Sequence, residues 1–179
     1  MMTSGDLAKL LSRLLGIPFS TIDLYGRRLR DAGMLSIKGH GRGAAHMTAV
    51  DATTWLTSLC VDHVRNGDFL REVKRPLKLP LLDALVLPNF ERGTRMFPTA
   101  RTAGEAIQFA IQDAMTTNEA PVVVFDSEGA FVSLSVGPVR SGGLWTYQRG
   151  ERERRMIEQN TALDGKVLVQ IAKALGPPK

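Results

Sequence analysis

Residues 20–35 read STIDLYGRRLRDAGML, and residues 36–47 continue as SIKGHGRGAAHM. The first stretch places apolar residues at helical spacing with arginines between them, which predicts a short basic helix. Gly33 follows it and is expected to end the helix in a left-handed conformation. The second stretch is rich in glycine and basic residues and lies between two short strand candidates. We therefore expect a basic helix followed by a basic hairpin loop.

Another helix is predicted just before this stretch. Residues 6–15 (DLAKLLSRLL) repeat leucine at helical intervals, and Gly16 ends the pattern. Ile17 should be extended, because the residue before a proline avoids the helical region. We expect Ser20 to cap the following helix, with Asp23 as a weak capping-box partner. The prediction is therefore two helices joined by a tight turn.

The helix predicted for residues 20–32 has two different faces when its residues are spaced at about 100° around the axis. Its packing side, which is expected to contact the preceding helix, consists of Ile22, Tyr25, Gly26 and Leu29. Its opposite side consists of Leu24, Arg27, Arg28 and Asp31, with Thr21 at the edge. Glycine on the packing side permits a close approach to a neighbouring helix, at a propensity cost of roughly 1 kcal/mol. The basic side is expected to face outward.

Short strands are predicted on both sides of the glycine-rich loop. Residues 34–38 and 44–48 are the two candidates, and the tip between them contains Gly39, Gly41 and Gly43. A further helix is expected from residue 48 to about residue 64. The N-terminal third thus combines a helix pair, a hairpin loop and a third helix.

This combination resembles the winged helix-turn-helix domains of bacterial and phage transcriptional regulators. The matching text is LAKLLSRLLGIPFSTIDLYGRRLRDAGML with the loop IKGHGRGAAHMT, within residues 4–60. In that family the helix after the turn reads the DNA major groove, and basic wing residues touch the minor groove or the backbone. The resemblance implies the first role for Ser20, Thr21, Leu24, Arg27 and Arg28, and the second for Lys38, His40 and Arg42. Either helix arginine could bind guanine through two hydrogen bonds, although a phosphate contact is the commoner use.

Positive charge is unevenly distributed along the chain. Residues 1–49 contain seven lysines and arginines against three aspartates, and so contribute +4 of the net +5. The other residues hold sixteen basic and fifteen acidic side chains. The excess in the predicted helix-turn-helix favours a polyanionic partner, which here is double-stranded DNA.

The remainder of the chain predicts an α+β fold. Residues 66–100 contain four prolines and are predicted to be a connector. Beyond them we expect a helix at 102–116, a hairpin of strands at 122–125 and 131–136, a third strand at 144–147, and helices at 151–159 and 165–175. The predicted parts are a winged helix-turn-helix domain (residues 1–65), the Pro-containing connector, and a small α+β domain (residues 101–179).

Several other kinds of function are disfavoured. No segment approaches the roughly 18 apolar residues that a membrane span needs, and the N-terminus lacks a signal-peptide pattern, so we expect a cytoplasmic protein without a membrane partner. Cys60 is the only cysteine, and the three histidines lack metal-ligand spacing, so neither a metal nor a cofactor is predicted. Asp126 and Glu128 read as turn residues rather than an acid/base pair, and no catalytic constellation is found. We therefore predict a protein that is not an enzyme.

Three functions fit these observations. The first is a sequence-specific transcriptional regulator of phage or mobile-element type, a homodimer because paired half-sites double the contacts. Its C-terminal part would dimerise, bind an effector or contact the transcription machinery. The alternative is a DNA-packaging or replication accessory protein, with the winged domain docked on an oligomeric assembly. The third is an enzyme or ligand-binding module in residues 102–175 that uses DNA contact for addressing.

Overall fold

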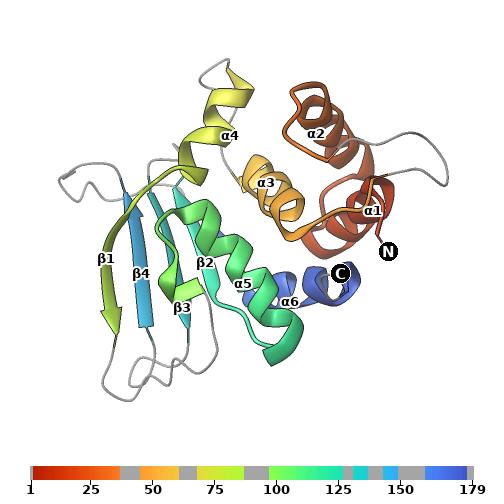
Figure 1. The fold of residues 1–179 in the computed structure, drawn as a ribbon. Coiled ribbons are helices and arrows are strands. Elements are labelled where there is room, and N and C mark those ends of the chain that lie inside the picture. The colour runs from red at the N-terminus through yellow and green to blue at the C-terminus, as the bar shows by residue number, and fades with distance from the viewer. Residues whose placement is uncertain are drawn as a thin grey trace.

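The computed structural model describes residues 2–36, 45–60, 68–86, 97–126, 131–136, 143–148 and 160–176. Over these residues the fold is α+β, as predicted, with helices and one antiparallel sheet. Figure 1 shows the sheet on the left, a middle layer of helices, and the N-terminal helices on the right.

The two predicted N-terminal helices are present. α1 (Ser4–Leu15) begins two residues earlier than expected, because Thr3 and Asp6 form a capping box. The Thr3 hydroxyl donates to the Asp6 carboxylate at 2.7 Å and so lowers the pKa of Asp6 below its usual value. Gly16 ends α1 with φ of 67°, in the left-handed region that favours glycine. α1 then packs against α2 (Phe19–Asp31).

The predicted Ser20 cap is wrong. α2 begins at Phe19, with Pro18 at the cap position and no side-chain hydrogen bond to the first turn. Because Pro18 already has φ of −53°, the helix can start directly after it. The end of α2 is as predicted, since Gly33 has φ of 66° and its N–H donates to the carbonyl of Arg30.

α3 (Ala49–Cys60) occupies the centre of the molecule in Figure 1. It contacts α2 on one side and both α5 (Ala103–Thr117) and α6 (Gly165–Leu175) on the other. Ten of its residues are buried. The predicted continuation to residue 64 falls outside the described residues. Because α3 is enclosed on both sides, one hydrophobic core extends from α1 to α6.

In the described part of the chain the sheet has five antiparallel strands in the order β1-β4-β3-β2-β5. They are β1 (Leu81–Val86), β2 (Val122–Asp126), β3 (Phe131–Val136), β4 (Gly143–Gln148) and β5 (Asn160–Leu163). The predicted hairpin and third strand are confirmed as β2, β3 and β4, with Val123 opposite Leu134 in the register. β5 was not predicted, and the helix expected at 151–159 lies outside the described residues.

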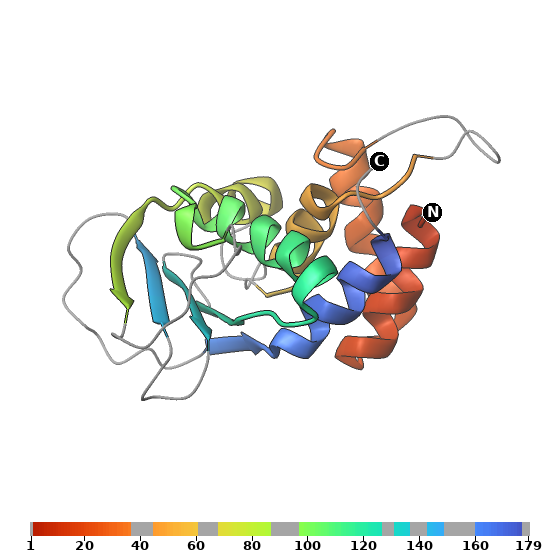
Figure 2. The same cartoon turned by 60° about the horizontal axis from the view of Figure 1, so that its bottom comes forward.

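Two helices cover one face of the sheet, as Figure 2 shows from below. α5 begins at a Thr102 capping box, and α6 has the bounds predicted from its pattern and from Gly176. Val123, Val132 and Leu134 are buried in the core, together with Ile107 of α5. α6 also contacts α1, so the C-terminal helix joins the sheet to the N-terminal pair.

In its described residues the predicted connector contains regular structure, namely a helix, a strand and the 3₁₀ helix η2 (Phe97–Thr99). α4 (Phe69–Leu77) packs on α3 and α5, and β1 pairs with β4 at one edge of the sheet. A helix and a strand thus occupy much of residues 66–100. The division of the chain into three domains stays a prediction.

Candidate nucleic-acid interface

The outer face of α2 agrees with the helical wheel. Ile22, Gly26 and Leu29 are buried, whereas Ser20, Leu24, Arg27, Arg28 and Asp31 are exposed. Leu24 is 46% exposed, so one large apolar side chain lies among the polar residues of this face. Thr21 is half-buried at the edge of this face. Four of the five helix residues predicted to contact DNA are therefore accessible, and the fifth is partly so.

Gly26 sets how closely α2 approaches the centre of the molecule. A Cβ atom at this position would lie 2.6 Å from Cη2 of Trp55 and closer still to Cζ2. Trp55 of α3 is completely buried, and its Nε1–H has no hydrogen-bond partner among the described residues. Packing rather than hydrogen bonding thus holds the indole against α2. The predicted close approach is present, but its partner is α3 instead of the preceding helix.

Asp23 neutralises part of the basic face. Its carboxylate lies 2.8 Å from the guanidinium of Arg27 and 4.0 Å from that of Arg30. Arg27 nevertheless remains 62% exposed, so the pair is accessible to solvent and weak in free energy. Its effect is geometric, because an i,i+4 ion pair favours one orientation of the arginine along the helix. The expected capping role of Asp23 is therefore wrong. The i,i+4 spacing of Asp23 and Arg27 in the sequence could have predicted their ion pair.

Arg28 makes a contact that sequence reasoning missed. Its guanidinium carbon lies 5.6 Å from the ring centre of Phe69, the first residue of α4. Tyr25 contacts the same ring, with centroids 5.5 Å apart and the planes tilted by 52°. A cation held over an aromatic face is attracted to it and keeps its edge available for hydrogen bonds. Tyr25 thus packs toward α4, although the wheel predicted contact with the preceding helix.

The predicted wing residues Lys38, His40 and Arg42 lie outside the described residues. The predicted flanking strands do not form where the structure describes them, at residues 34–36 and 45–48. The reason is a competing acceptor, the carboxylate of Asp51. Backbone N–H groups of Ser36 and Thr48 donate to it at 2.7 and 2.8 Å, so they do not pair with another strand there.

Asp51 collects four hydrogen bonds although it is only 2% exposed. Besides the two N–H groups, the hydroxyls of Ser36 and Thr48 donate at 3.0 and 2.7 Å. Ser36 precedes the predicted loop and Thr48 follows it. One buried carboxylate therefore fixes both ends of this segment relative to α3.

We expect Asp51→Asn to lower the free energy of unfolding by about 2 kcal/mol, because the amide replaces one acceptor oxygen with an NH₂ group that faces buried donors. The matched control is Asp6→Asn, since Thr3 and Asp6 form the same capping box in an exposed position. That change should cost no more than about 1 kcal/mol. Urea unfolding of both variants measures the difference. Equal losses would show that Asp51 acts only as a helix cap.

The helix pair α1 and α2 has a shallow hollow of about 260 Å³ on its surface. It is lined by Lys9, Ser12 and Arg13 of α1 and by Phe19 of α2, and it is open to solvent. Small-molecule pockets are usually enclosed and have volumes of about 300–1,000 Å³. We therefore interpret the hollow as a groove in a basic surface rather than as a ligand site.

Other chemistry is limited in the part of the chain that the structure describes. Burial raises the pKa of the Cys60 thiol to about 12, so it stays protonated and unreactive near neutral pH. No group of three or more His, Cys, Asp or Glu side chains in the described ranges could hold a metal ion. None of the described helices is both long and apolar enough to cross a membrane.

Comparisons of the chain with protein-family models, with curated proteins and with solved structures found no significant match. The functional proposal therefore rests on the placement and chemistry of the residues described above.

Proposed function

We propose that this protein is a sequence-specific DNA-binding transcriptional regulator in which α2 enters the major groove. The observation that carries the proposal is the outer face of α2, where Ser20, Leu24, Arg27 and Arg28 are exposed above a packed opposite face. A recognition helix needs this combination, because the packed face must fix the orientation of the side chains that meet the bases.

The dimensions and side chains of α2 suit a groove. An α-helix with its side chains is about 10–12 Å wide, and the major groove is about 12 Å wide. Ser20 and Thr21 near the helix start can hydrogen-bond a base edge or a phosphate. Leu24 is exposed and can contact a thymine methyl group. The arginines supply the phosphate contacts or one guanine contact.

The winged form of the motif belongs to the same proposal. Lys38, His40 and Arg42 would contact the backbone or the minor groove beside the site that α2 reads. Asp51 supports this role, because it holds Ser36 and Thr48 in place at the two ends of the predicted loop. The proposed protein acts in the cytoplasm as a homodimer, and its C-terminal part binds the second copy, an effector or the transcription machinery.

Selection of bound duplexes from a genomic library tests the function. We expect one recovered motif, bound at least about 1,000-fold more tightly than a scrambled duplex. Both affinities should fall steeply when salt rises from roughly 50 to roughly 200 mM, because phosphate contacts release counterions. Binding of no duplex at the lower salt would refute the proposal. Analytical ultracentrifugation of the protein bound to the recovered duplex then gives its oligomeric state. A dimer would support a regulator, whereas a ring or filament would support a packaging or replication accessory protein.

A further inference from the structure

A second row of basic residues lies on α4, outside the segment that the predicted DNA contacts occupy. Arg71, Lys74, Arg75 and Lys78 recur at i, i+3, i+4 and i+7, which places them on one face of the helix and its C-cap. All four are exposed, whereas Glu72, Val73 and Pro76 on the opposite side are buried. The α4 basic row, as we call these four residues, therefore has an exposed surface dominated by positive charge.

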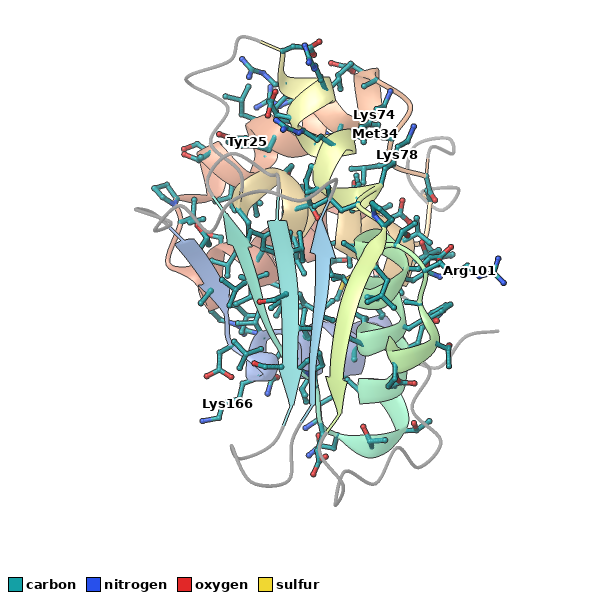
Figure 3. The ribbon with its side chains drawn as sticks, turned by 90° about the vertical axis from the view of Figure 1, so that its left-hand side faces the viewer. Tyr25, Met34, Lys74, Lys78, Arg101 and Lys166 are labelled. Atoms are coloured by element: carbon teal, nitrogen blue, oxygen red, sulfur yellow. The ribbon has the colours of Figure 1, made fainter. Side chains whose placement is uncertain are left out.

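The start of α4 is fixed beside α2. Both helices pack on α3, and the Phe69 ring touches Tyr25 and Arg28 of α2. Figure 3 shows Lys74 and Lys78 at the same end of the molecule as Tyr25, with Lys166 at the far end. Arg28 of α2 contacts Phe69 of α4 directly. The basic surface of α2 and that of α4 are therefore neighbours.

We propose that the α4 basic row binds the phosphate backbone of the same DNA duplex that α2 reads. This inference rests on the proposed function and adds a contact surface to it. The Phe69 ring at the start of α4 touches Tyr25 and Arg28 of α2 directly, and the major groove is only about 12 Å wide. With α2 in the groove, α4 stands at the groove wall, where the phosphates lie.

The length of the row suits such a contact. Seven residues of helix rise about 10 Å, and one strand of DNA carries a phosphate about every 3.4 Å along the duplex axis. The row therefore spans about three phosphates. Of the acidic residues on α4 and its N-cap, Glu72 is buried and the Asp68 carboxylate accepts the backbone N–H of Arg71 at 3.1 Å, so the one exposed carboxylate among them lies at the N-terminal end of the row.

Cations near a helix C-terminus also stabilise the helix, because they interact favourably with its dipole. Lys74 and Arg75 lie in the last turn of α4 and contribute in this way. That effect alters the stability of the protein but not the salt dependence of DNA binding. The two roles are therefore separable by experiment.

The test compares Lys74→Gln/Lys78→Gln with the control Lys166→Gln/Lys173→Gln, which removes the same charge from exposed positions on α6. Affinity for the selected duplex is measured over a range of salt. Each lost phosphate contact should reduce the slope of log affinity against log salt by about 0.9, so we expect a reduction of about 1.8 in the first variant. The control should keep the slope of the unaltered protein, and both should keep its sequence preference.

The outcomes separate the two proposals. If the unaltered protein binds no duplex at low salt, the proposed function and this inference are both wrong. If it binds and both double variants keep its slope, only the α4 contact is overturned. A changed sequence preference in the α4 variant would also overturn it, because α4 would then read bases rather than phosphates.

Discussion

Gly26→Ala is expected to lower the free energy of unfolding by about 3 kcal/mol, because overpacking a well-filled core typically costs about 1–3 kcal/mol and this site has little room to relax. The added methyl group would meet the indole of Trp55, with 2.6 Å left to Cη2. Trp55 cannot withdraw easily, since it is completely buried and α3 also contacts α5 on its other side. Urea unfolding followed by circular dichroism measures the loss.

Gly5→Ala is the matched control for this substitution. Gly5 also lies in a helix, but a Cβ atom there would meet only the Thr3 hydroxyl oxygen, at 3.9 Å. The control should be neutral or gain up to about 1 kcal/mol from helix propensity. In the double variant Gly26→Ala/Trp55→Leu, the smaller side chain should recover part of the loss, so the two costs should not add. Equal stability of the two alanine variants would contradict the packing of α2 on Trp55.

Arg28→Ala should lower the preference for the selected DNA site over a scrambled one. A bidentate arginine–guanine contact contributes about 1–3 kcal/mol of discrimination, so the ratio of the two affinities should fall roughly tenfold or more. The Phe69 ring supports this role, because a guanidinium whose carbon lies 5.6 Å from the ring centre is attracted to the ring, which restricts the arginine. Titration of both duplexes with the variant, at one salt concentration, measures the ratio.

Arg28→Lys distinguishes a base contact from a phosphate contact. Lysine keeps the charge but lacks the planar fork that pairs with guanine. If Arg28 reads a base, the lysine variant should bind both duplexes tightly and still lose the preference. A lysine variant that retains the preference would assign Arg28 to a phosphate. Arg42→Ala should give the reverse pattern, with weaker binding but the same preference, because a wing contact to the backbone carries no sequence information.

The helices that the sequence predicted well carry their own local signals. α6 has its predicted bounds because apolar spacing and the Gly176 stop agree, and α5 follows from the same reasoning with Thr102 at its start. The two faces of α2 were predictable for a similar reason, since Ile22, Gly26 and Leu29 recur on one side. The Asp23–Arg27 pair has the i,i+4 spacing and was also within reach of the sequence.

The elements that were missed depend on contacts between distant residues. β1 gains its strand conformation from β4, where Ala84 lies opposite Trp145, and no local pattern announces that pairing. Pro76 favoured a connector, but a proline in the last turn of α4 removes only one hydrogen bond from a helix that packs on α3 and α5. The Asp51 carboxylate accepts a hydrogen bond from the N–H of Ser36, a residue 15 positions away. In the site, the Phe69 contact of Arg28 is of the same long-range kind.

The position of α3 has a consequence for how a signal would cross the molecule. One side of this helix packs against α2 through Trp55, and the other side packs against α5 and α6, which cover the sheet. A close-packed helix has no slack in which two neighbouring layers could slide independently. A ligand or partner that shifted α5 would therefore move the α2 face as well. If α2 binds DNA as proposed, a displacement of α5 would therefore change the position of α2 in the major groove.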